Sequence, residues 1–341
     1  MSNNKLHAAK RAKNDEFYTQ MTDIEREMVH YRRQFVGKTI FCNCDDPEES
    51  NFWKYFYTNF DYLMLEGLIS THYEYDKQSY KLEVYRDTDT GMRGRICRTP
   101  LKGNGDFRSD ECVELLKQVD IVITNPPFSL FREYVAQLME YDKKFIIIGN
   151  INAITYKEIF PLIRDNKLWA GANSKGGTRK GNTLCFAIPE GHEVKNAVLS
   201  PDGKPLTQVS AWWFTNMDLK KRHDELFLYR HYHGKDHDRY PKYDNYDAIE
   251  VSKTVDIPCD YDGVMGVPIT FLDKFNPDQF EIIGMCENKD LYGLKTRVYS
   301  SEECKQRYME LFGKKGTYDL NASGVVNGKK VYQRILIRRK H

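Results

Sequence analysis

Short apolar runs alternate with helix-like segments through the first half of the chain. Each run ends at polar or turn-forming residues, which is typical of strands buried on both faces of a parallel sheet. The runs are Lys38–Asn43, Leu68–Tyr73, Val119–Thr124 and Phe145–Ile148. The segments between them carry apolar residues at helical spacing. This alternation predicts an α/β fold with a doubly wound parallel sheet.

Two later segments show the alternation of apolar and polar residues that is expected of antiparallel strands. They are Thr183–Ile188 and Ser210–Thr215, and a hairpin around Asp202–Lys204 is expected to join them. The sheet is therefore predicted to finish with an antiparallel pair.

The regular periodicity fades from about Asn216, where aromatic and turn-forming residues become frequent. We expect an α/β domain over residues 1–215, with an insertion at 74–105, and a separate loop-rich α+β domain over 216–341. The second domain ends in a predicted strand, Val331–Arg339, whose arginines are expected to face outward.

Composition indicates a soluble, reduced, cytoplasmic protein. The chain has 341 residues, of which 40% are hydrophobic, and its mean hydropathy is −0.66. It contains neither a long apolar stretch of the kind that spans a membrane nor the apolar core of an N-terminal signal peptide. Its eight cysteines form no CxxC pair, so neither a disulfide framework nor a zinc site is indicated.

Positive charge is concentrated locally although the net charge is only +2. The first fourteen residues and the segment 311–341 are rich in Lys and Arg, and so is the stretch Arg164–Lys242. Any one of these could be an ordinary solvated face, but together they favour contact with a phosphate backbone. The candidate DNA-binding residues are Lys10, Arg11, Lys175, Arg179, Lys180, Arg222, Arg230, Arg239, Arg334 and Arg338.

The most informative motif follows the strand that ends at Thr124. Asn125 is held at the carboxyl end of the strand, because Pro126 and Pro127 cannot continue a sheet ladder and restrict the residues before them. The Asn125 amide oxygen and its peptide carbonyl are uncharged acceptors, and Phe128 offers a flat apolar face. Together they suit an amino group on an aromatic ring. Accepting both of its hydrogens directs the nitrogen lone pair toward an electrophile.

The simpler interpretation is an ordinary Asn-Pro-Pro turn between a strand and a helix. Ser129 would then cap that helix. We favour a catalytic role for Asn125, Pro126, Pro127 and Phe128, because the whole motif directly follows a buried strand and is far more specific than Asn-Pro alone.

Other candidate ligand-binding residues also stand at strand ends. Asp45, Asp46 and Pro47 follow the first strand, and Glu74 follows the second, where an acid can accept hydrogen bonds from a ribose. Glu74 could equally be a surface residue. No GxGxxG motif is present, so a cofactor on the first loop is inferred from position and carboxylates alone. The turn at Asp106 and Phe107 could bind an adenine, through its amino group and its ring.

A metal site is not expected. His231, His233 and His237 are close in sequence, but they lack matching cysteines and a HExxH helix. The arginines around them favour phosphate or base contacts instead.

The chain resembles the EcoRI-type DNA adenine methyltransferases, within the class I enzymes that use S-adenosylmethionine (AdoMet). The similarity covers nearly all of it and is carried by Lys5–Lys13, Asp15–Gln20, Phe41–Pro47, Thr124–Phe128, Trp213–Asn216 and Met265–Leu272. It implies a Rossmann-like sheet and a C-terminal target-recognition region. It also implies that Asn125–Phe128 is the catalytic motif, that Tyr18 and Thr19 flank AdoMet, that Asp45, Asp46 and Pro47 lie on the first loop, and that Asp106 and Phe107 lie at the cofactor adenine. The other candidate cofactor residues are Asn125 and, from its position at a strand end, Glu74.

The resemblance implies methyl transfer to adenine N6 of duplex DNA after the base leaves the stack. We expect a bacterial or phage-encoded monomer that needs no metal. It would act as an orphan methylase or beside a restriction endonuclease without a stable complex. The alternatives are a methyltransferase of RNA adenine or protein glutamine, and a non-catalytic DNA-binding module.

Overall fold

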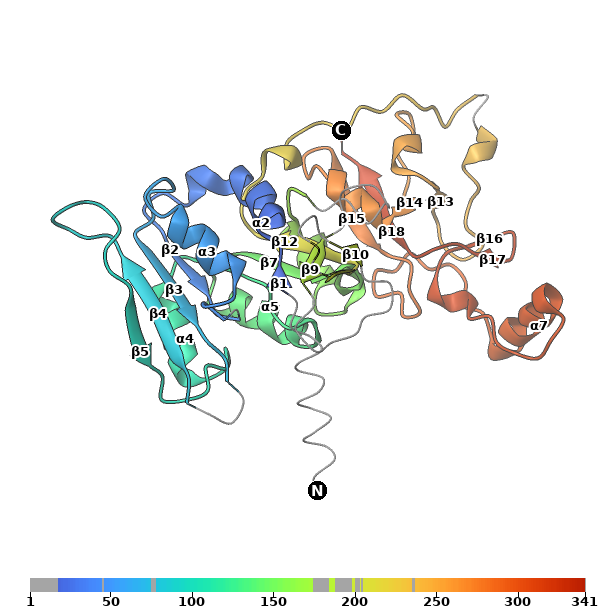
Figure 1. The fold of residues 1–341 in the computed structure, drawn as a ribbon. Helices are drawn as coiled ribbons and strands as arrows, with labels where there is room; N and C mark the ends of the chain where they lie inside the picture. The colour runs from blue at the N-terminus through green and yellow to red at the C-terminus, as the bar shows by residue number, and fades with distance from the viewer. Residues whose placement is uncertain are drawn as a thin grey trace, which may run out of the picture. The chain divides into compact units, whose positions relative to one another are not determined.

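The computed structural model describes residues 18–44, 46–74, 78–173, 184–187, 198–199, 203, 205–234 and 237–340 (Figure 1). The chain divides into two compact units. The first extends to Leu219, and the second comprises Lys220 onward together with Arg164–Asn166.

The first unit is built on an eight-stranded sheet of order β5-β4-β3-β2-β6-β7-β12-β8. Its strands are β2 Thr39–Cys42, β3 Gly67–Thr71, β4 Tyr80–Tyr85, β5 Cys97–Pro100, β6 Ile121–Thr124, β7 Lys144–Asn150, β8 Trp169–Ala170 and β12 Ala211–Thr215. The central strands β3, β2, β6 and β7 are parallel. The outer strands β4, β5, β12 and β8 run antiparallel to their neighbours. The α/β prediction is confirmed, but the sheet is mixed, with antiparallel strands at both edges.

The helices follow the predicted apolar patterns. They are α2 Met21–Met28, α3 Asn51–Thr58, α4 Asp110–Gln118, α5 Phe131–Glu140 and α6 Phe160–Arg164, with 3-10 helices η1 Val29–Gln34, η2 Phe128–Leu130 and η3 Ile151–Thr155. Ser50 and Ser109 cap α3 and α4 by accepting backbone N–H groups. Within the described residues, no helix is long and apolar enough to cross a membrane.

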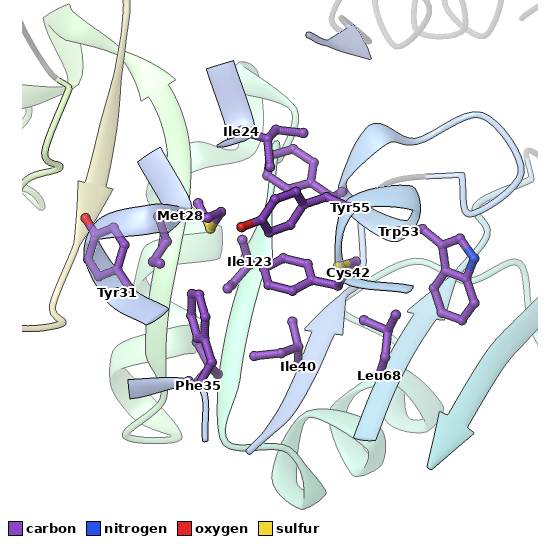
Figure 2. Packing of buried hydrophobic residues seen from close by; sticks show 14 of the residues in the cluster. Ile24, Met28, Tyr31, Phe35, Ile40, Cys42, Trp53, Tyr55, Leu68 and Ile123 are labelled. Atoms are coloured by element: carbon purple, nitrogen blue, oxygen red, sulfur yellow. The ribbon is translucent and has the colours of Figure 1, made fainter. Parts of the chain in front are cut away.

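The core of the first unit forms between the early helices and the sheet. Figure 2 shows Met28 and Phe35, from α2 and the end of η1, beside Ile40 of β2 and Ile123 of β6. All four side chains are fully buried. Fully burying a large apolar side chain contributes about 1.5–3 kcal/mol, so this face of the sheet is firmly anchored.

A second sheet in this unit has the order β1-β9-β11-β10. Its strands are β1 Tyr18–Thr19, β9 Cys185–Ala187, β10 Val198–Leu199 and β11 Pro205–Gln208. The predicted partners were wrong: the antiparallel strands on either side of residues 202–204 are β10 and β11. Strand β9 pairs with β1 and β11, whereas β12 pairs with β7. Local alternation identified strands here but could not specify their partners.

The second unit contains a four-stranded sheet of order β13-β14-β18-β15 and a small hairpin. Its elements are β13 Ile249–Glu250, β14 Met265–Pro268, β15 Phe280–Met285, β16 Val325–Val326, β17 Lys329–Lys330, β18 Arg334–Arg339, α7 Ser301–Phe312, η4 Lys220–Arg222, η5 His237–Arg239, η6 Thr254–Asp256, η7 Ile269–Lys274 and η8 Leu320–Ala322. Ser300 and Glu303 form a capping box at α7.

Candidate active site

The order of the strands identifies where a ligand would bind. The chain moves outward from β2 to β3 and later returns to the other side of β2 as β6 and β7. Such a reversal leaves a crevice at the carboxyl ends of the two central strands. Asn43 directly follows β2, and Asn125 directly follows β6. The polar residues that follow β2 and β6 therefore both lie beside the point where the order of the strands reverses.

The Asn-Pro-Pro-Phe turn is compact and largely buried. Asn125 and Pro126 are buried, while Pro127 and Phe128 are partly exposed. The Pro127 carbonyl accepts the Leu130 N–H at 3.0 Å, which closes η2 before α5 begins at Phe131. The predicted Ser129 cap was wrong, because the chain makes this 3-10 turn first and α5 has no side-chain cap.

Phe128 lies at the edge of an aromatic and hydroxyl-lined region. Its ring meets Phe186 of β9 edge to face, with centroids 6.5 Å apart. Phe186 pairs in register with Thr19 of β1, whose hydroxyl is buried without a hydrogen-bond partner among the described residues. The pairing of β1 with β9 thus brings the predicted residue Thr19, and the backbone of Tyr18, toward the Asn-Pro-Pro-Phe turn.

Helix α5 holds two loops of the site. Tyr134 donates a hydrogen bond from its hydroxyl to the amide oxygen of Asn43, and its ring meets Phe107 edge to face at 4.9 Å. Gln137 donates to the Phe107 carbonyl at 3.1 Å. The helix that follows Asn125 therefore also fixes the end of β2 and the turn before α4.

Asp106 and Phe107 are less available for binding an adenine than the sequence suggested. The Asp106 carboxylate accepts hydrogen bonds from the Arg108 backbone and guanidinium at 2.6–2.9 Å. Burial raises the pKa of Asp106, but these bonds from Arg108 outweigh it and hold the pKa below its usual range. Phe107 is buried against Tyr134, so its contact with an adenine stays a prediction.

His72, which was not a candidate from the sequence, lies close to the carboxylates of the candidate residues Asp46 and Glu74. His72 Nε2 lies 3.4 Å from Asp46 Oδ2 and 3.9 Å from Glu74 Oε2. The histidine ring stacks on Tyr80, with centroids 4.9 Å apart. Pro47 is buried beside Asp46. The position of His72, just after the second strand and two residues before Glu74, was the signal that could have identified it.

The polar groups at this edge fit the AdoMet that is expected from the sequence. Asn43 Nδ2 is buried and has no partner among the described residues, so a donor is available beside the reversal point. The carboxylates of Asp46 and Glu74 can accept from hydroxyl or ammonium groups. Asp45 lies outside the described residues. A cofactor with a carboxylate, an ammonium group and a ribose would find complementary groups here.

Two of the predicted DNA-binding arginines are not at the surface. Arg222 is buried and donates to Asn166, and Arg334 is buried in a pair with Glu250. The expectation that Arg334 faces outward was wrong because Arg334–Ile337 of β18 are all buried, so alternation exposes no face there. Arg239 and Arg338 are exposed, and Arg230 is partly exposed. Lys10, Arg11, Lys175, Arg179 and Lys180 lie outside the described residues.

Gly149 of β7 is required by the packing of α5. A Cβ atom at this position would lie 2.3 Å from the Phe131 ring, which directly follows the Asn-Pro-Pro-Phe turn region. We expect Gly149→Ala to displace that ring and, with it, the turn that is expected to be catalytic. The rate of the catalysed reaction should then fall about 100-fold, since a shift of 1 Å at a reacting group has that effect. The double variant Gly149→Ala/Phe131→Leu should recover part of the rate in a steady-state assay. Equal rates for wild type and Gly149→Ala would contradict the packing constraint.

Comparison with known proteins identifies relatives along nearly the whole chain. A family model described as adenine-specific methyltransferase EcoRI matches residues 5–340. The chain is 48% identical over 304 residues to the Type II methyltransferase M.EcoRI of Escherichia coli, covering 83% of this chain and 89% of that protein. It is 38% identical over 345 residues to M.MgeORF184P of Mycoplasma genitalium, covering 98% of each. It is 40% identical over 297 residues to M.MpnI of Mycoplasma pneumoniae, covering 86% of this chain and 90% of that protein.

The chain also has a weak likeness to some solved structures. An endonuclease V of Ciona intestinalis in complex with DNA is 14% identical, with a TM-score of 0.19, and the match covers 44% of this chain and 70% of that chain. A likeness this low carries no inference.

Proposed function

Since the chain belongs to the family of the adenine-specific methyltransferase EcoRI, we propose that it methylates adenine N6 at a specific site in duplex DNA. The observation that carries this proposal is the Asn125–Phe128 turn at the point where the strand order reverses. The similarity to enzymes named Type II methyltransferases supports a DNA substrate.

The sheet is proposed to be of the class I methyltransferase type. The parallel strands β3-β2-β6-β7 with the antiparallel β12 beside β7 support this assignment. In that arrangement the cofactor would lie at the carboxyl ends of the parallel strands, beside the reversal of strand order between β2 and β6. Thr19, Asn43, Asp46 and Glu74 are the residues that would hold it, and AdoMet would supply the methyl group as the electrophile.

The catalytic contribution of this chain is mainly positioning. Adenine N6 cannot be reached inside the duplex, so the base must be extruded, which costs a few kcal/mol. The extruded ring would stack on Phe128, and its amino group would donate to the Asn125 amide oxygen and to the adjoining backbone carbonyl. Accepting both hydrogens keeps the N6 lone pair directed at the methyl donor. An amide is not a base, so the proton released from N6 would pass to water.

The second unit is proposed as the target-recognition region. Arg239 and Arg338 are exposed there, and Arg230 is partly exposed, so these three remain the described candidates for phosphate or base contacts. We further propose that the protein acts as a monomer. Its relatives' designation as Type II methyltransferases supports a role beside a restriction endonuclease.

Methylation of three substrates side by side tests the function. The full-length protein and tritium-labelled AdoMet are expected to label duplex DNA, whereas single-stranded RNA and a glutamine-containing peptide should stay at background. Digestion of the labelled DNA to nucleosides should place the label in N6-methyladenine. Labelling of RNA or peptide alone would overturn the proposal, and so would salt-sensitive DNA binding with no transfer.

A further inference from the structure

Three side chains of the second unit converge although they come from distant parts of the chain. His231 and Cys259 are 28 residues apart, yet Cys259 Sγ lies 3.5 Å from His231 Nδ1 and 3.9 Å from its Nε2. Asp260 Oδ2 also lies 3.5 Å from His231 Nδ1. One ligand atom from each residue lies within 4.8 Å of the others. The fold therefore supplies the cysteine that was missing from the sequence pattern around His231.

The backbone around these residues is tied together independently of their side chains. The Cys259 N–H donates to the Arg230 carbonyl at 2.8 Å, next to a bridge between Arg230 and Pro258. The Asp260 carboxylate accepts the N–H of Tyr232 at 2.5 Å and that of His233 at 3.2 Å. Segments 230–233 and 258–260 are thus held in register, and the carboxylate is already oriented by two donors. Such preorganisation is typical of a ligand that is fixed by its surroundings.

A cysteine nucleophile activated by histidine and aspartate is not the better interpretation. In a catalytic triad the nucleophile and the carboxylate use opposite nitrogens of the imidazole. Here both Cys259 Sγ and Asp260 Oδ2 lie nearest to Nδ1. One imidazole nitrogen cannot accept a proton from the Cys259 thiol while it also donates a hydrogen bond to the Asp260 carboxylate. Three ligand groups of these types within 4.8 Å of one another are, however, compatible with a shared cation.

Two of the three separations between the candidate ligand atoms are close to those of a tetrahedral zinc site. Zinc bonds of about 2.3 Å to sulfur and about 2.0–2.2 Å to nitrogen or oxygen place neighbouring ligand atoms about 3.3–3.6 Å apart. The two separations of 3.5 Å from His231 Nδ1 agree with this geometry. Cys259 Sγ also lies 3.9 Å from Nε2, so the exposed His231 ring would rotate on binding to direct Nδ1 at the ion. A thiolate and a carboxylate carry two negative charges, which a divalent cation neutralises. Thiolate and imidazole ligands select zinc-like ions over magnesium or calcium.

We propose that His231, Cys259 and Asp260 bind a divalent zinc-like cation, with a fourth position open to water. The His231 side chain is 64% exposed, which leaves room for that water. The bound ion would link segment 230–233 to segment 258–260. Because Arg230 directly precedes His231, the ion would also order a candidate DNA-contacting residue. This site shares no residue with those proposed for methyl transfer, so the two proposals can be tested independently.

Cobalt(II) titration of the full-length, chelator-treated protein tests the site. One equivalent of Co²⁺ should produce the visible bands of a tetrahedral complex and a thiolate-to-cobalt band in the near ultraviolet, and Zn²⁺ should displace both. Cys259→Ser and His231→Gln are expected to weaken Zn²⁺ binding by at least about 100-fold, since even outer-sphere changes reduce affinity 10–100-fold. Zn²⁺ at a hundredfold excess over its Kd should raise the Tm by about 5 °C in wild type but not in these variants.

Two matched variants guard against non-specific binding and misfolding. His233→Gln changes an exposed histidine two positions away, and Cys97→Ser removes an exposed cysteine of the first unit. Both should keep the cobalt spectrum and the Zn²⁺-dependent Tm shift. Absence of a thiolate-to-cobalt band in wild type would overturn the proposal. Equal loss of that band in Cys97→Ser or His233→Gln would do the same.

Discussion

Replacing Asn125 with alanine should reduce methyl transfer to duplex DNA at least about 1,000-fold. Loss of one preorganised polar contact to the reacting group typically costs 10²–10³-fold, and the adenine would also lose its alignment. Asn125 is buried at the end of β6, so its amide is held in place before the base arrives. AdoMet binding, measured by calorimetry, should remain, because the proposed cofactor residues Thr19, Asn43, Asp46 and Glu74 are unchanged.

Two further variants make the Asn125 experiment decisive. Asn150 ends β7, where its side chain accepts the Asn152 N–H at 2.9 Å, and Asn150→Ala should lose only this local cap. Asn125→Asp keeps an acceptor oxygen and should retain more activity than Asn125→Ala. Undiminished single-turnover transfer by Asn125→Ala would remove this residue from the mechanism.

Replacing Arg334 with methionine should destabilise the second unit by about 3–5 kcal/mol, because it leaves a buried carboxylate without its partner. The guanidinium contacts Glu250 at 2.6–3.1 Å, and the two side chains are only 9% and 5% exposed. Tyr243 donates its hydroxyl to the same carboxylate. The loss should appear as a lower urea midpoint for the unfolding of the full-length protein.

The same strand offers a matched control for the buried pair. Arg338 contacts Glu281 at 3.1 Å, but these side chains are 45% and 40% exposed. Arg338→Met should therefore change stability by no more than about 1 kcal/mol. The double variant Arg334→Met/Glu250→Leu should recover most of the loss, since it leaves no unpaired charge. Similar losses for Arg334→Met and Arg338→Met would show that burial does not determine the effect.

The central part of the site was predictable because its signals are local. An apolar run followed by Asn-Pro-Pro defines both the buried strand β6 and the position of Asn125 at its end. The Ser50 and Ser109 caps are likewise local, because each side chain accepts an N–H only two or three residues further along the chain. These features require no knowledge of the neighbouring strands.

The features that were missed depend on contacts distant in sequence. Alternation along β18 suggested that Arg334 faces outward, but period-two reasoning holds only where one face of a strand is solvated. His72 could be identified as a site residue only once the end of β3 was seen to lie beside Asp46 of the first loop. Cys259 and His231 likewise meet through tertiary packing. No local pattern specifies such pairs.

The pairing of β1 with β9 also has a consequence for the order in which the protein is made and folded. Thr19 is among the first residues of the described chain to leave the ribosome, but its strand partner Phe186 follows much later. At synthesis rates of 5–20 residues per second, Thr19 waits about ten to thirty seconds for that partner. The parallel strands β2, β3, β6 and β7 are all synthesised before then. A nascent chain can therefore form the parallel strands of its central sheet well before Phe186 can pack against Phe128, so the enzyme should become active late in its own synthesis.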